Sequence, residues 1–326
     1  MQQLLGNERL LKELNTAVKE NRIAHAYLLC GGEGSGKKTL ADMMCRMFLC
    51  SDGGCGRCAV CAKLEKNIHP DVVHITGATK SGNYSVDQIR SLRREALVYP
   101  NEAGKKIYIL HQAEKLTPNA QDAFLKILEE PPEFVVFLLL CSDESKLLAT
   151  IHSRVIRLAM ETPDSEESLD WLIGKTGEEA GLCTVALGIS GGNPGRALKL
   201  LETGLLSHRI AQCEEFCKLL TNSSAYDLAA FSHKLAADKA EFCEFVKLLC
   251  LYLRDVLVSR STRSTEQLVF AESIRENSKD LSLFNLRNIP EVIEQLQHLA
   301  ILASQPYSML LIETSLVTLT LEKLVR

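Results

Sequence analysis

The sequence predicts an α/β domain built on a parallel sheet, followed by a region that is almost wholly helical. In the first half of the 326-residue chain, short apolar runs alternate with helical patterns, which is typical of a doubly wound fold. The runs are continuously apolar, as expected of strands that are buried on both faces. After about Glu161 the strand signal fades and the pattern becomes helical.

The elements of the first half can be placed in order along the chain. The expected strands are residues 26–30, 71–75, 107–111, 134–141 and 155–158. Helices are expected between them at residues 37–49, 85–97 and 118–130. Ser85 and Gln88 have the spacing of a capping box at the start of the second helix, and Pro131 with Pro132 stops the third.

The second half divides at polar breaks. Residues 161–165 form a polar, proline-containing joint, and a helical pattern then runs to Leu206 with a glycine-rich interruption at residues 190–195. From residue 207 to the end the pattern is helical, with apolar stripes that indicate core packing. We therefore expect three domains, at residues 1–161, 162–206 and 207–326.

Composition excludes several classes of protein. No apolar run is long enough to span a bilayer, and the first residues carry Glu8 and Glu13, unlike a secretory signal. We expect a cytoplasmic protein with no membrane association. The net charge of -4 argues against strong DNA binding by the isolated chain, because phosphate-driven affinity needs clustered cations.

A phosphate-binding loop follows the first strand. Residues 31–38 read Gly-Gly-Glu-Gly-Ser-Gly-Lys-Lys and lead into a helix, which is the context that a P-loop requires. A plain glycine-rich turn is the alternative, and the flanking strand and helix argue against it. The candidate nucleotide contacts in this segment are Gly31, Gly34, Gly36, Lys37, Lys38 and Thr39.

The metal-binding part of this site is defective. Lys38 stands where Ser or Thr should ligate Mg²⁺, and Thr39, one residue later, should point elsewhere. The strand that should end in an acidic residue ends in His111-Gln112, and Glu114 lies further on, on a flanking loop or helix. We predict no meaningful ATP hydrolysis and impaired Mg²⁺ binding, and leave open whether ATP or ADP binds.

Four of the twelve cysteines form a cluster: Cys50, Cys55, Cys58 and Cys61. Four thiolates at this spacing, among glycines that permit sharp turns, predict a closed structural zinc site. An iron–sulfur cluster is the rival, but the ferredoxin pattern has its fourth cysteine further downstream, followed by proline. Four free thiols are the remaining alternative. We expect most of the other cysteines to be buried packing residues.

The order of motifs then resembles a known family, the bacterial DNA polymerase III clamp-loader AAA+ proteins of the delta-prime type. The resemblance is carried by residues 24–29, the P-loop, the four-cysteine insert, residues 123–132 and His152-Ser153-Arg154. It covers the first half of the chain strongly and the later helices only in character.

The resemblance implies a RecA-like AAA+ core, a small helical lid and an all-α C-terminal collar for the three expected domains. It also implies a heteropentamer with delta and tau/gamma subunits that loads the sliding clamp onto primer-template DNA. In that family a Ser-Arg-Cys motif supplies an arginine finger to a neighbour's ATP. This chain reads Ser153-Arg154-Val155, and the resemblance carries the role to Arg154. An ordinary surface salt bridge is the alternative.

Other residues carry weaker predictions. The family can place a sensor arginine at the position of Arg196, where a structural loop arginine is an equal alternative. Ser142 follows a strand that usually carries a polar phosphate sensor, although helix capping is the favoured interpretation. The arginines at positions 90, 93 and 94 share a helical face and could touch DNA phosphate, but a solvated face is the commoner explanation.

Three functional classes therefore compete. The first is a non-hydrolysing subunit of the DNA polymerase holoenzyme, which Lys38 and His111-Gln112 favour. The second is an active ATPase of the tau/gamma type. The third is an independent zinc-containing DNA-binding protein, which the acidic net charge and the closed cysteine insert disfavour.

Overall fold

A computed structural model describes residues 4–79, 81–222, 224–262, 268–303, 305 and 307–325. The chain forms two compact units, Met1–Ser168 and Leu169–Arg326, and each is described by itself. In the residues described, no helix is long and apolar enough to cross a membrane. The three-domain division stays a prediction.

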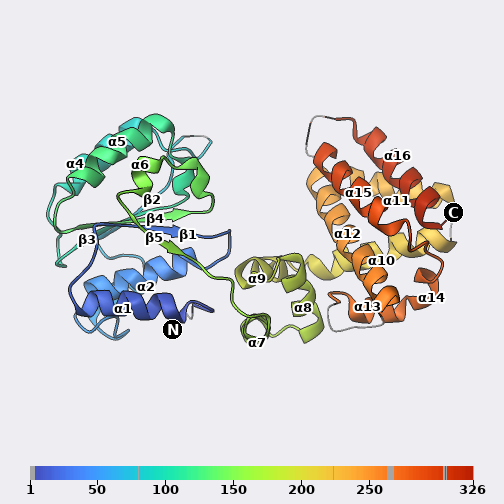
Figure 1. The fold of residues 1–326 in the computed structure, drawn as a ribbon, viewed down its shortest axis with the longest axis horizontal. Coiled ribbons are helices and arrows are strands. Elements are labelled where there is room, and N and C mark those ends of the chain that lie inside the picture. Colours follow the sequence, from blue (N-terminus) through green and yellow to red (C-terminus); the bar gives the residue numbers. More distant parts are fainter. Residues whose placement is uncertain are drawn as a thin grey trace. The chain divides into compact units, whose positions relative to one another are not determined.

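The first unit is built on a five-stranded parallel sheet in the order β2-β3-β4-β1-β5 (Figure 1). The strands are β1 Ala26–Cys30, β2 Val72–Ile75, β3 Lys106–Leu110, β4 Val135–Cys141 and β5 Ile156–Ala159. All five predicted strands are confirmed, with ends within one residue of the expected ones. The three central strands are buried along their whole length, which is why they read as unbroken apolar runs.

Helices cover both faces of this sheet (Figure 1). One face carries α1 Glu8–Lys19 and α2 Lys37–Leu49, whose Leu14, Leu40 and Met44 pack on alternate strand residues such as Leu29. The other face carries α4 Val86–Ala96, α5 Pro118–Glu129 and α6 Ala149–His152. Shorter elements are α3 Ala59–Glu65, η1 Ala113–Lys115 and η2 Glu144–Lys146. The layered α/β arrangement predicted from the sequence is confirmed.

The start of α4 departs from the prediction in one respect. The hydroxyl of Ser85 accepts a hydrogen bond from the Gln88 N–H at 3.2 Å, so the N-cap is present. The reciprocal half of the predicted capping box is absent, because the Gln88 amide donates to the Thr76 carbonyl at 2.7 Å and accepts from the Ala78 N–H. Gln88 therefore ties the loop after β2 to α4 instead of closing the cap.

Asp71 organises the connection between α4 and β3. Its buried carboxylate accepts the backbone N–H groups of Asn101, Glu102 and Ala103 and the Asn101 side-chain amide. Burial alone would raise the pKa of Asp71, but these four donors outweigh it and the pKa is lowered. One carboxylate thus satisfies the donors of a loop that has no strand or helix partners of its own.

The second unit is helical and has its own core. Its helices are α7 Ser165–Thr176, α8 Ala180–Ile189, α9 Pro194–Glu202, α10 Leu206–Asn222, α11 Ala225–Ala236, α12 Lys239–Thr262, α13 Ala271–Glu276, α14 Ser278–Leu281, α15 Ile289–Ala303, α16 Met309–Thr320 and η3 Leu321–Val325. Phe216, Phe245 and Tyr252 lie at the centre of its packing, each 0–1% exposed. The helical character predicted for this half is confirmed.

Candidate nucleotide and metal sites

Helix α2 links the two candidate sites of the first unit. Its first residue, Lys37, closes the phosphate loop, and its C-cap residue, Cys50, is the first cysteine of the cluster. Between them, Leu40, Ala41 and Met44 are fully buried against the sheet. The helix therefore holds both sites in fixed places on the core.

The phosphate loop has the backbone shape that its glycines allow. Gly34 and Gly36 adopt φ angles of 79° and 89°, in the left-handed region that favours glycine. A Cβ on Gly36 would lie 2.8 Å from Leu4 Cδ1, and one on Gly31 would lie 2.6 Å from Ser35 Oγ. Since Gly36 offers no side-chain cap, the first N–H groups of α2 are not capped by the residue that starts it.

Lys37 lies inside this loop. Its ammonium group donates to the carbonyl oxygens of Gly31 and Gly32, the latter at 2.7 Å. Burial lowers the pKa of Lys37, and the nearby negative charge of Glu114 opposes that shift. The predicted phosphate-binding lysine is thus held at the loop, within electrostatic reach of Glu114.

Two histidines occupy the place expected for the metal-binding acid. His111 follows β3 directly, and its Nε2 lies 3.1 Å from Nδ1 of His74 on the neighbouring strand β2. The two rings stack with centroids 5.3 Å apart. Burial lowers the pKa of both imidazoles. The charge of Asp42 opposes this shift at His74, and the charges of His74 and Lys38 add to it at His111. The site therefore presents a pair of imidazoles where a hydrolase needs carboxylates.

Asp42, on helix α2, is a carboxylate whose charge acts on His74. It lies one turn after Lys38 on α2, and burial raises its pKa while the charges of Lys38 and His74 lower it. Neither Asp42 nor His74 was picked out from the sequence. The only sequence signal for this group of residues is the i, i+4 spacing between Lys38 and Asp42, and such a spacing is common on exposed helices.

Glu114 reaches the site from the turn after β3. It lies on η1, and its Oε2 accepts the backbone N–H of Ser142 at 3.1 Å. Ser142 does not cap a helix as the favoured interpretation expected, because Asp143 is the N-cap residue of η2. The contact between Glu114 and Ser142 spans 28 residues, so no local pattern could have indicated it.

Arg154 follows α6, and its guanidinium donates hydrogen bonds to three neighbouring groups. Its Nη2 donates to Glu129 Oε1 at 2.9 Å, and its Nη1 donates to the Thr150 carbonyl at 3.0 Å and to Ser153 Oγ at 3.2 Å. The salt bridge that was the alternative interpretation is therefore present. Its partner, Glu129, is the last residue of α5.

The remaining predicted contacts lie at separate places. Thr39 is in the first turn of α2, directly after Lys38. Arg196 is on α9 in the second unit, where its backbone N–H donates to the side chain of the N-cap residue Asn193. The sensor role of Arg196 stays a prediction.

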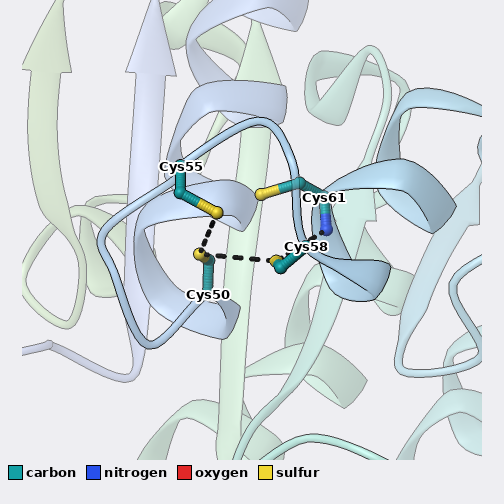
Figure 2. Close-up of side chains that lie close together, drawn as sticks. All are labelled: Cys50, Cys55, Cys58 and Cys61. Atoms are coloured by element: carbon teal, nitrogen blue, oxygen red, sulfur yellow. Dashed lines mark hydrogen bonds between the residues drawn. The ribbon is translucent and has the colours of Figure 1, made fainter.

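The four cysteines converge on one point (Figure 2). Cys50 Sγ lies 3.7 Å from the sulfurs of Cys55 and Cys58, and all four sulfurs lie within 4.8 Å of one another. Four sulfurs bound tetrahedrally at the usual Zn–S length would lie about 3.8 Å apart. The spacing and the all-thiol donor set fit zinc, and the cluster could hold one such ion.

The local backbone explains why the sulfurs meet. Gly53, Gly54 and Gly56 all have positive φ angles, which turn the chain sharply between the first and third cysteines. Cys58 is the N-cap residue of α3, and its sulfur accepts the Cys61 N–H at 3.4 Å. The sequence prediction of a tight glycine-assisted cluster is confirmed for the arrangement of the thiols.

The thiols differ in their readiness to ionise. Burial opposes ionisation of Cys50, but backbone N–H groups of residues 52, 54 and 55 lower its pKa to about 6. Burial raises the pKa of Cys61 to about 12. A bound zinc ion would displace the proton from such a thiol, because the thiolate is the metal ligand.

A cationic pocket lies on the outer side of α4 and α5. Arg90, Arg93 and Lys126 line it together with Asn119 and the acidic Asp122, and its volume is about 380 Å³. Arg94 instead donates to Ser91 at 3.0 Å and does not line the pocket. Two of the three arginines predicted to share a face are thus combined with a lysine from the next helix.

The parallel sheet, the P-loop between β1 and α2, and the helical second unit define the class of protein. This is a RecA-like AAA+ core followed by an all-helical region. A solved structure of a gamma-subunit-related protein from Thermotoga maritima covers 95% of the chain with a TM-score of 0.47 at 18% identity.

Comparison of sequences finds relatives among the subunits of DNA polymerase III. Residues 6–164 match the family model described as DNA polymerase III, delta subunit. A delta' subunit from Pseudomonas aeruginosa is 36% identical over 207 residues, covering 62% of this chain and 63% of that protein. A delta' subunit from Haemophilus influenzae is 29% identical over 236 residues, covering 72% and 70%. The tau subunit of Bacillus subtilis is 25% identical over 308 residues, covering 86% and 54%.

Over the matched residues the chain is similar to subunits of bacterial DNA polymerase III, delta' among them. It spans less than two thirds of the length of the Pseudomonas and Bacillus relatives.

Proposed function

We propose that this chain is a delta-prime-type subunit of the clamp loader, which helps to place the sliding clamp on primed DNA without hydrolysing ATP itself. Its partners are delta and tau/gamma subunits in a heteropentamer, working in the cytoplasm at the replisome. The observation that carries the proposal is the paired imidazoles of His74 and His111 beside a well-formed phosphate loop. Similarity to DNA polymerase III delta' subunits supports the assembly part.

Hydrolysis fails for an electrostatic reason. Metal-assisted attack needs Mg²⁺ at the β- and γ-phosphates and a carboxylate near it. Lys38 places a cation at the position of the first metal ligand, and the imidazoles of His74 and His111 carry no negative charge. Glu114 is not at the strand-end position of the missing acid: it lies on η1, and its Oε2 accepts the Ser142 N–H. The phosphate loop itself keeps the groups that bind ATP or ADP.

The test is steady-state ATP turnover by the purified chain. We expect a rate no higher than that of the Lys37→Ala variant, which removes the phosphate-binding ammonium. Turnover that the wild-type chain shows and Lys37→Ala abolishes would refute the proposal. It would favour the second candidate, an active ATPase of the tau/gamma type.

We further propose that Arg154 acts on the ATP of a neighbouring subunit as an arginine finger. Arg154 is the second residue of the Ser153-Arg154 pair that follows α6, and its side chain is one-third exposed, so it is accessible to a partner. In a reconstituted loader, we expect Arg154→Ala to slow hydrolysis and clamp loading while assembly is retained. Unchanged ATPase and clamp-loading rates in that variant would contradict the finger role.

Zinc at the four cysteines is proposed as a structural ion. All four positions of a tetrahedral site are filled by protein sulfurs, which leaves no open position for substrate or water. For the pocket lined by Arg90, Arg93 and Lys126, a solvated face stays the favoured interpretation, because Asp122 also lines it and Arg90 pairs with Asp87. The isolated chain, with its net charge of -4, is not expected to bind DNA tightly. Tight binding would favour the third candidate, an independent DNA-binding protein.

Assembly itself can be tested directly. We expect the full chain to co-purify with delta and tau/gamma subunits when they are mixed in solution. Failure to associate under conditions where delta and tau/gamma bind each other would overturn the assignment as a loader subunit.

A further inference from the structure

Some of the N–H donors of the Arg154 guanidinium are used in hydrogen bonds within this chain, and others are available to a ligand. A guanidinium has five N–H donors. Two from Nη1 are used by the Thr150 carbonyl and Ser153 Oγ, and one from Nη2 is used by Glu129. Among the residues that the structure describes, no acceptor is found for the Nε donor or for the second Nη2 donor, which are enough for two hydrogen bonds to an oxyanion.

The acceptors that hold Arg154 lie on two rigid elements. Thr150 and Ser153 belong to α6 and its C-cap. Glu129 ends α5, a helix anchored by Phe124 and Leu128, which are at most 2% exposed. The arginine is therefore braced from the side of α5 as well as from its own helix, and its long side chain does not have to be ordered by the ligand.

We propose that Glu129 is a positioning residue, which orients Arg154 so that its remaining donors face the γ-phosphate of ATP bound to a neighbouring subunit. This inference rests on the proposed role of Arg154 as an arginine finger. Pre-ordered donors stabilise developing charge most effectively because no reorganisation is needed at the moment of reaction.

A simple structural role for the pair predicts a different outcome. The side chains of Arg154 and Glu129 are 34% and 50% exposed, and ion pairs of such exposure add little to folding stability. If the pair only joined α5 to α6, removing the Glu129 charge would change neither stability nor activity. Positioning instead predicts lost activity at unchanged stability.

The experiment uses the reconstituted loader with clamp and primed DNA, and measures the single-turnover rate of ATP hydrolysis against ATP concentration. We expect Glu129→Gln to lower the maximal rate at the site served by Arg154, on the order of tenfold, with half-saturating ATP unchanged. Glu129→Asp should recover part of the rate, because it keeps the charge. The matched control is Glu130→Gln, an exposed neighbour whose loss should leave the rate unchanged.

The double variant Glu129→Gln/Arg154→Ala should be no slower than Arg154→Ala alone, because Glu129 acts through the arginine. A wild-type rate in Glu129→Gln, with Arg154→Ala impaired, would overturn the positioning role and leave the finger intact. Additive losses in the double variant would overturn it as well. A wild-type rate in Arg154→Ala would remove the finger and the positioning role together. Equal assembly and equal melting temperatures of the variants confirm that folding is not the cause.

Discussion

The two ends of helix α2 carry polar sites that differ in their metal ligands: one has a full set and the other does not. At its C-terminal end, four sulfurs lie within 4.8 Å of one another and supply every ligand that a tetrahedral ion needs. At its N-terminal end, the phosphate loop is formed around Lys37, but the metal positions hold Lys38 and His111. The same helix thus begins next to Lys38 and the His74–His111 pair and ends at a cluster of four thiols that could hold a metal ion.

The difference shows that a motif has to be judged position by position. The glycines and the lysine of the P-loop determine backbone shape and phosphate contact, and they are intact. Metal binding depends on other side chains from α2 and the end of β3, and those are replaced. In the cysteine cluster, by contrast, the residues that shape the loop and the residues that bind the ion lie within one segment, residues 50–61.

The largest expected effect concerns the complete site. We expect the purified protein to contain one zinc ion per chain, and Cys58→Ser to lose it, because a hydroxyl is a poor replacement for a thiolate ligand. Structural zinc sites contribute about 10–16 kcal/mol of apparent binding free energy at neutral pH. Elemental analysis of the two proteins measures the difference.

Cys45→Ser is the control for that measurement. Cys45 lies on α2 five residues before Cys50, is buried in the core, and has its pKa raised by burial. It takes no part in the cluster, so its variant should keep the full zinc content. Iron in place of zinc, or wild-type protein without metal, would contradict the assignment.

The incomplete site offers a test by repair. The triple variant Lys38→Thr/His111→Asp/Gln112→Glu restores a hydroxyl ligand and strand-end acids. We expect Mg²⁺ to tighten its binding of a fluorescent ATP analogue by at least about tenfold, or ~1.4 kcal/mol. Titration with Mg²⁺ or with a chelator provides the measurement. The comparison between the two ends of α2 breaks down if wild-type protein already shows the same Mg²⁺ dependence.

Asp71 tests how much stability a buried polar group contributes when all of its hydrogen-bond partners are present and no metal is involved. Its buried carboxylate has four donors, and we expect Asp71→Asn to lower the free energy of unfolding by about 3 kcal/mol, because the amide leaves buried N–H groups unpaired. Urea unfolding at neutral pH measures this. A loss below about 1 kcal/mol would show that the loop is held by other contacts.

The acid dependence of stability follows from the same residue. The pKa of Asp71 is lower in the folded protein than its ordinary value of about 3.9, so its contribution is present above that pH. The contribution is lost as the pH falls through the folded-state pKa. Asp71→Asn should therefore lack part of the acid-induced loss of stability seen in wild type, and unfolding curves between neutral pH and pH 3 would show it.

The smallest expected effect lies next to this anchor. Lys63, on the helix that closes the cysteine insert, pairs with the carboxylate of Glu102. Both side chains are more than one-third exposed, so Glu102→Gln should change the free energy of unfolding by less than about 1 kcal/mol. The backbone N–H of Glu102 still reaches Asp71 in this variant. A loss as large as that of Asp71→Asn would mean that the insert is fixed mainly through this pair.

Local sequence patterns predicted the elements well because their causes are local. The strands of the sheet are continuous apolar runs, and Thr117 with Pro118 begins α5 where the third helix was expected. The thiol cluster could also be predicted, since twelve consecutive residues contain all four ligands. The hydroxyl of Ser85 capped its helix as expected, but Gln88 turned to Thr76, which the spacing alone could not indicate.

The contacts that were missed join residues far apart in the chain. Glu114 meets Ser142, Glu129 meets Arg154, and His74 meets His111, at separations of 28, 25 and 37 residues. Each depends on which strands are neighbours in the sheet or on how two helices end side by side. A single sequence carries no local signal for such pairings, so the chemistry at the phosphate loop could be predicted only in outline.

Helix α2 also determines how far an event at one end is felt at the other. Its 13 residues extend over about 20 Å, and its middle is locked into the core by side chains with at most 2% exposure. Fraying at a helix end is confined to roughly the last turn when the middle is anchored in this way. We therefore expect that loss of the ion, or oxidation of the thiols at the end of the helix, leaves the structure of the phosphate loop at its start unchanged.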